Sequence, residues 1–156
     1  MQAVIALVLV GVFVFWLITV WRVKKRKQSL LIIKAQSRQE TIPAVEQAFV
    51  ATIAQLNMER DVLSSLAQSQ DVAKIWGLRV LAFEFECEVS PNFEKHLTQF
   101  SELLEAQLKT QKVAIPAFKS FALTDIWLRD GRLHFDVAEN KNEDTAAYIR
   151  DVKRVD

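Results

Sequence analysis

The chain has 156 residues and a formal net charge of +1, and its one cysteine, Cys87, excludes an intrachain disulfide and a multi-cysteine metal site. Three glycines are too few for a Gly-rich phosphate-binding loop. All 19 acidic residues follow position 27, whereas five of the 20 Lys and Arg residues precede position 28, so residues 28–156 carry a net charge of about −4. This mildly acidic part is long enough for one folded domain, and its charge argues against a nucleic-acid-binding surface.

The first predicted element is a helix over residues 3–21, where 19 consecutive side chains are uncharged. A helix of that length covers about 28 Å, close to the hydrocarbon thickness of a bilayer. Two alternatives fit less well: a signal peptide would need a shorter apolar stretch and a small-x-small cleavage site, and a buried core helix would need a larger domain around it. We therefore predict a transmembrane helix, preceded by a short extracytoplasmic N-terminus at residues 1–2.

A basic cluster directly follows this apolar run, and no Lys or Arg precedes it. Because Lys and Arg beside a span stay on the cytoplasmic side, residues 22–156 are predicted to face the cytosol from the plasma (inner) membrane, in a single-pass arrangement with the N-terminus outside. The cluster can also hold anionic lipid headgroups of the bilayer. The predicted membrane-interface residues are Trp21, Arg22, Lys24, Lys25, Arg26 and Lys27.

Residues 22–42 are predicted to form a basic juxtamembrane segment, which either prolongs the first helix or lies along the membrane interface. Pro43 suits the first position of a new helix. A long amphipathic helix over residues 43–74 then follows, because apolar side chains recur at close to helical spacing. These apolar positions are Val45, Phe49, Ile53, Leu56, Leu63 and Leu66.

Residues 75–156 are predicted to form a small α+β domain. Residues 83–89 alternate between apolar side chains and glutamates, which indicates a half-buried strand, although the apolar residues of 78–89 also satisfy a helical period. Ser90 and Pro91 suit the start of a helix that runs to about residue 112.

Asp130 and Gly131 stand between two alternating runs, the pattern of a two-residue type I′ hairpin. A short closing helix follows a polar loop at 139–144. The predicted fold is thus α+β: a transmembrane helix, a long amphipathic helix, and a three-stranded sheet in the order β-α-β-β-α with helices on one face. In the hairpin, the predicted inner pairs are Leu128 with Leu133, Ile126 with Phe135 and Thr124 with Val137, and the outer pairs are Trp127 with His134 and Asp125 with Asp136.

The outer side of this hairpin carries candidate metal ligands. Asp125, His134 and Asp136 would converge there, and the glutamates at 84, 86 and 88 would join them if their strand presents the same face. Facing carboxylates repel, and a bound cation or a protonated imidazole would relieve that cost. A solvated charged sheet face gives the same pattern, so the three residues stay candidates and no metal or cofactor is predicted.

Trp127 lies on the same side and is the candidate partner-binding residue, because an exposed tryptophan can anchor an interface. Its alternative is burial under the final helix. His96 is predicted to be a boundary residue of its helix. Carboxylates beside Cys87 should raise the pKa of its thiol, which is the opposite of activation. No nucleophile motif stands near either histidine, so the sequence predicts no enzyme.

These features predict a single-pass membrane protein that presents a cytosolic α+β domain as a protein-binding, scaffold or assembly module. Its partners would be the bilayer and an unidentified protein, and no nucleic acid. A bitopic structural subunit of an envelope or secretion machine, with inverted topology, is one alternative. A membrane-tethered metal-dependent enzyme that uses the three candidate ligands is the other.

Overall fold

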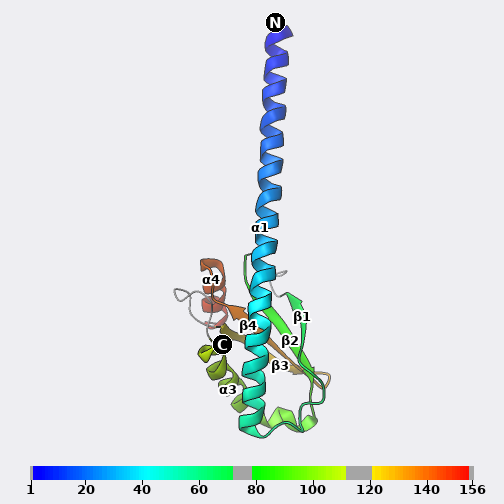
Figure 1. The fold of residues 1–156 in the computed structure, drawn as a ribbon, viewed down its shortest axis with the longest axis vertical. Helices are drawn as coiled ribbons and strands as arrows, with labels where there is room; N and C mark the ends of the chain where they lie inside the picture. The colour runs from blue at the N-terminus through cyan, green and yellow to red at the C-terminus, as the bar shows by residue number, and fades with distance from the viewer. Residues whose placement is uncertain (1, 72–78, 112–120, 155–156) are drawn as a thin grey trace. The chain divides into compact units, whose positions relative to one another are not determined.

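The computed structural model describes residues 2–71, 79–111 and 121–154, without the side chains of residues 2–10, 27 and 69–71. The chain divides into two compact units, Met1–Ala35 and Gln36–Asp156. Its elements, shown in Figure 1, are α1 (Gln2–Leu56), β1 (Ala67–Asp71), β2 (Ala82–Glu88), the 3₁₀ helix η1 (Pro91–His96), α3 (Leu97–Thr110), β3 (Phe121–Arg129), β4 (Arg132–Glu139) and α4 (Glu143–Val152).

The first unit is entirely helical in its described part and belongs to α1. Many of its apolar side chains are exposed, from Val12 at 62 % to Ile18 at 44 %. The sequence predicts a transmembrane helix over residues 3–21. Among the residues that the structure describes, no helix is long and apolar enough to cross a membrane.

The helix α1 continues through Pro43 and ends at Leu56, so the predictions of a new helix at Pro43 and of a helix reaching residue 74 are wrong. Pro43 is exposed. It has no amide hydrogen, so the helix continues through it without the backbone hydrogen bond that this residue would otherwise donate. At the other end Asn57 has a φ of 54°. The amide of Asn57 donates to the Ala54 carbonyl at 3.2 Å and that of Met58 to the Ile53 carbonyl at 3.0 Å, the two bonds of a Schellman cap.

In the described residues the sheet has four antiparallel strands in the order β1-β2-β4-β3, so the prediction of three strands is wrong and the α+β class is confirmed. The additional strand, β1, lies within the range predicted as amphipathic helix. It pairs with β2 at one edge of the sheet, with a bulge between Gln68 and Gln70. For residues 82–88 the strand interpretation is confirmed over the helical one.

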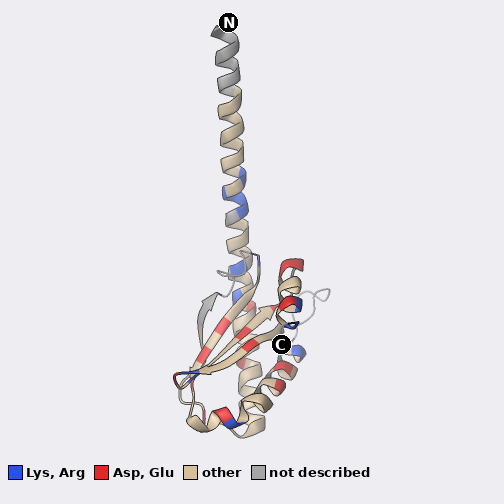
Figure 2. Ribbon diagram, turned by 180° about the vertical axis from the view of Figure 1, so that it is seen from behind, with Lys and Arg blue, Asp and Glu red and all other residues tan. Residues whose placement is uncertain are grey.

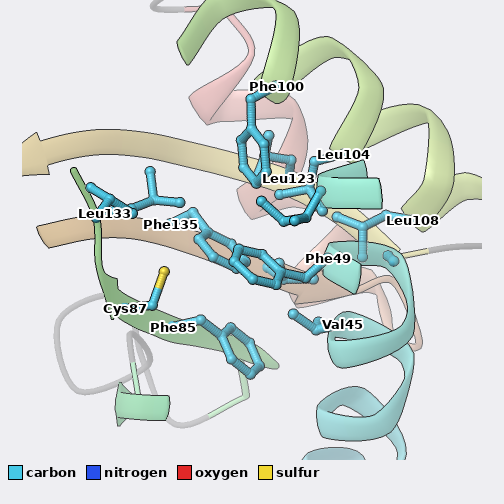
Figure 3. Close-up of a cluster of buried hydrophobic side chains, with 14 of the residues drawn as sticks. Val45, Phe49, Phe85, Cys87, Phe100, Leu104, Leu108, Leu123, Leu133 and Phe135 are labelled. Atoms are coloured by element: carbon cyan, nitrogen blue, oxygen red, sulfur yellow. The ribbon is translucent and has the colours of Figure 1, made fainter. Parts of the chain in front are cut away.

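The core fills the space between one face of the sheet and two helices (Figure 3). Phe49 of α1 stacks on Phe135 of β4, with ring centroids 6.0 Å apart, and Phe135 in turn stacks on Phe85 of β2 at 5.6 Å. From α3, Phe100 meets Phe49 edge-to-face at 5.7 Å. The buried side of α3 includes Phe100, Leu104 and Leu108.

The final helix packs on the opposite face of the sheet. Ala82 and Ala138 are paired neighbours that point away from the aromatic core, and they form a second apolar cluster with Tyr148 of α4. Asn142 caps α4 by accepting a hydrogen bond from the Thr145 amide at 2.7 Å. The prediction that helices cover one face only is wrong, because α4 covers one end of the other.

The hairpin forms at the predicted turn, where both Asp130 and Gly131 have positive φ angles of 51° and 74°. The predicted inner pairs at Leu128 and Ile126 and both predicted outer pairs are confirmed. One inner pair is wrong. A register shift at Thr124 makes Leu123, and not Thr124, the partner of Val137.

Candidate functional site on the outer sheet face

Two rows of polar side chains cross the face of the sheet that points away from the aromatic core. The antiparallel pairing places Glu84 opposite Asp136, and Glu86 opposite His134. On the other side of β4, Asp125 is paired with Asp136 and Trp127 with His134. Figure 2 views the molecule from this side and shows the acidic positions along the strands. We call this surface the outer face.

His134 contacts two carboxylates on the outer face. Its Nδ1 lies 3.0 Å from Glu84 Oε1 and 3.6 Å from Glu86 Oε2. Only 14 % of the His134 side chain is exposed, against 18 % for Glu84 and 25 % for Glu86. One ligand atom from each of the three residues lies within 4.8 Å of the other two. We call these three residues the Glu-Glu-His cluster.

The indole of Trp127 packs on the imidazole of His134. Their ring centroids lie 5.2 Å apart, and the ring planes differ by 5°. Trp127 is thereby half-buried, and it fixes the plane of the imidazole ring. The predicted contribution of Trp127 to partner binding stays a prediction, with a half-buried indole as its structural basis.

Arg132 supplies positive charge at one end of the outer face. It donates one hydrogen bond to Glu86 Oε1 at 3.2 Å and another to Glu88 Oε1 at 3.1 Å. The other oxygen of Glu86, Oε2, is the one that faces His134. Glu86 therefore bridges the arginine and the imidazole.

Asp136 is the most deeply buried acid of the outer face, with 8 % of its surface exposed. Burial, together with the smaller contributions of the negative charges of Glu84 and Asp125, raises the pKa of its carboxyl to about 7. Within the described part of the chain, Asp136 Oδ1 has no hydrogen-bond partner. Asp125 differs, because it is exposed and its Oδ1 accepts a hydrogen bond from the Ile126 amide at 2.8 Å.

The three predicted ligands therefore do not form one group. His134 is in contact with Glu84 and Glu86, whereas the aspartates at 125 and 136 lie in the neighbouring row. The sequence placed the glutamates on this face but did not assign them as the partners of His134. The strand order supplies that assignment. Strand β4 lies between β2 and β3, and its pairing with β2 brings the glutamates beside His134.

A second polar cluster lies on the core side of the sheet. Glu139 is completely buried there and accepts a hydrogen bond from Ser37 of α1. Lys141 lies 3.3 Å from Glu139 Oε1 and 2.7 Å from Glu40 Oε2. Burial raises the pKa of Glu139, although the Ser37 hydrogen bond and the Lys141 charge oppose that effect. Sequence analysis missed these four residues, which we call the inner polar cluster.

Cys87 and His96 take no part in these clusters. Cys87 is buried in the core, where burial, assisted by the charge of Glu86, raises the pKa of its thiol to about 12. The direction predicted from the sequence is confirmed, but burial is the larger cause. His96 is exposed at the end of η1.

The predicted membrane-interface residues of the first unit lie along α1. Trp21 is 59 % exposed, and the ammonium of Lys25 lies 4.1 Å from the centroid of its ring. Arg22, Lys24 and Arg26 are exposed as well, and the side chain of Lys27 lies outside the described residues.

No family model matches this chain, and neither a curated protein nor a solved structure shows significant similarity to it.

Proposed function

We propose that the chain is a membrane-anchored binding module. Residues 3–21 would hold it in the bilayer, and the folded unit Gln36–Asp156 would present its outer face to a protein partner in the cytosol. The proposal contains no catalytic step.

The observation that carries the anchor is the exposed apolar surface of the first unit. Seven consecutive residues at 12–18 are all large and apolar, and each exposes between 44 and 69 % of its surface. Such surface is stabilised by an apolar environment, and the uncharged run that contains it is long enough to span a bilayer. The exposed arginines and lysines that follow favour cytoplasmic placement of the rest of the chain.

The outer face is the surface that supports partner binding. Its central row combines a half-buried indole, Trp127, with the polar side chains of Glu86 and His134. Interfaces concentrate binding energy in aromatic side chains of this kind, surrounded by polar groups. The helix α4 covers the end of this face, where Tyr148 packs with Ala82 and Ala138 and donates a hydrogen bond to Thr124 Oγ1 at 3.3 Å.

Alkaline carbonate extraction of cell membranes tests the anchor. The full chain should stay in the pellet, whereas Val14→Lys combined with Leu17→Lys should release it, because each buried lysine costs about 2.5 kcal/mol or more at the centre of a span. Val50→Lys with Leu63→Lys is the matched control, since these apolar residues are even more exposed but lie in the folded unit. Release of the unsubstituted chain would contradict the proposal.

Labelling of intact cells tests the orientation. In the variant Cys87→Ser with Asp156→Cys, the new thiol should react with a membrane-impermeant reagent only after the cells are opened. Labelling in intact cells would place the folded unit outside and would favour a bitopic structural subunit over a cytosolic module.

Affinity purification in mild detergent tests the outer face. Trp127→Ala should weaken capture of the bound protein about fivefold or more, equivalent to about 1 kcal/mol, with an unchanged circular dichroism spectrum. Val50→Ala, at an exposed position of α1, is the control and should leave capture unchanged. Equal capture by both variants would exclude the outer face as the binding surface.

A further inference from the structure

We propose that Glu84, Glu86 and His134 bind one divalent first-row transition-metal ion, with zinc as the test ion. This inference is independent of the proposed membrane anchor and of the protein partner.

The donor atoms already stand close to coordination geometry. Zinc binds histidine nitrogen and carboxylate oxygen at about 2.0–2.2 Å, so two of its ligand atoms lie no more than about 4.4 Å apart. The three donors of the Glu-Glu-His cluster lie within 4.8 Å of one another, and His134 Nδ1 is 3.0 Å from Glu84 Oε1. Small side-chain rotations would therefore place all three donors around one ion.

Rigid elements hold these donors. Glu84 and Glu86 come from β2 and His134 from β4, which are the two central strands of the sheet. Trp127 fixes the imidazole plane from one side. Arg132 holds Glu86 Oε1, which leaves Oε2 of the same carboxylate toward the imidazole. A site on paired strands keeps its geometry better than one on loops.

The outer face also carries more negative than positive charge, which favours the binding of a cation. Two rows contain four carboxylates, and His134 is the one basic side chain in those rows among the described residues. Arg132, in the next row, is already bonded to two glutamates. Like charges on adjacent strands destabilise a sheet, and a divalent ion would offset that repulsion.

An independent observation comes from Asp136. Its side chain lies opposite Glu84 on the same face, is 8 % exposed, and carries an oxygen, Oδ1, with no hydrogen-bond partner in the described chain. A buried oxygen of this kind needs a donor or a cation, because an unsatisfied polar group is costly to bury. Next to Glu84, it can accept a hydrogen bond from a metal-bound water.

The composition of the cluster selects the class of ion. Magnesium and calcium prefer ligand sets made of oxygen, whereas imidazole together with carboxylates suits zinc, iron or manganese. We therefore expect zinc to bind and magnesium, at the same concentration, to fail to displace it.

Isothermal titration calorimetry with zinc chloride tests this assignment on the full chain in detergent, without a histidine tag. About one ion should bind per chain, and His134→Ala and Glu84→Gln should each weaken binding by at least about 10-fold. His96→Ala is the matched control, because it removes the only other histidine at an exposed position outside the cluster. It should change the affinity less than about twofold.

Circular dichroism spectra and thermal melts of both cluster variants check the fold. Glu86→Gln gives a third variant should His134→Ala fold poorly. The proposal is overturned if the unsubstituted chain binds no zinc stoichiometrically, or if folded cluster variants keep its affinity. Loss of binding in His96→Ala alone would overturn it as well.

Discussion

The inner polar cluster and the outer face place acids on opposite sides of the same strand and satisfy them differently. Glu139 is completely buried, but it receives a hydrogen bond from Ser37 and lies beside the ammonium of Lys141. Asp136 is almost as buried. Each of the two acids has one oxygen that accepts no hydrogen bond among the described residues, but Glu139 Oε1 lies 3.3 Å from the ammonium of Lys141, whereas the charged neighbours of Asp136 are acids. The first acid is compensated by the chain itself. The second needs a proton or an external cation.

This difference separates a structural cluster from a candidate binding site. A buried ion pair that is complete within the chain contributes to packing and leaves no capacity for a ligand. An acid cluster without sufficient counter-charge is destabilising by itself and gains stability when a cation arrives. The comparison therefore predicts opposite responses when residues of the two clusters are neutralised.

The largest effect is expected for Lys141→Ala. Removing the ammonium leaves the completely buried Glu139 without its counter-charge, which should lower the free energy of unfolding by about 3 kcal/mol. Urea denaturation followed by circular dichroism measures this loss. Lys109→Ala breaks the exposed pair with Glu105 and should cost less than about 0.5 kcal/mol. Equal losses in the two variants would show that the inner polar cluster is not a compensated buried site.

The second effect has the opposite sign and is expected for Asp136→Asn. The carboxyl is surrounded by Glu84 of β2, Asp125 of β3 and Tyr148 of α4, and its pKa is raised from 3.8 to about 7. A raised acid pKa gives stability that is present below pH 4 and is lost as the pH rises through about 7. In chelator at pH 8, the variant should be about 2 kcal/mol more stable than the unsubstituted chain.

Urea denaturation of both proteins at pH 4 and at pH 8 measures that difference. The gain should disappear at pH 4, where the native carboxyl of Asp136 is already protonated. A variant that is less stable at pH 8 than the unsubstituted chain would show that the charged carboxylate is satisfied, and the two clusters would then be alike.

The smallest effect is expected for Glu86→Gln in the absence of metal. Its partly exposed ion pair with Arg132 is lost, but so is the repulsion from Glu84, and the two changes should nearly cancel within about 0.5 kcal/mol. Thermal melting in chelator checks this. A loss as large as that of Lys141→Ala would mean that the outer face, too, is held together by its own charges.

The local features of the sheet could be predicted from the sequence. Asp130 and Gly131 specify the hairpin, and the alternation of phenylalanines with Glu84 and Glu86 specifies which face of β2 is buried. These signals depend on neighbours along the chain, so they do not require knowledge of the topology. The bulge at Thr124 has no comparable local signal.

The features that sequence analysis missed depend on distant contacts or on caps. Asn57 ends α1 in a left-handed cap, and the polar strand β1 has no apolar alternation to reveal it. Pairing of β2 with β4 brings Glu86 beside His134. The sequence does not indicate which of the two hairpin strands, β3 or β4, pairs with β2. Glu139 had one usable signal, since it continues the inward alternation of β4.

Zinc content after equilibrium dialysis tests the central claim most directly. The unsubstituted chain and His96→Ala, dialysed against micromolar zinc and then against metal-free buffer, should retain about one zinc per chain by plasma mass spectrometry. The double variant Glu84→Gln with His134→Ala should retain about a tenth of that or less. Equal zinc in all three proteins, or none in any of them, would contradict the assignment of a cation to the outer face.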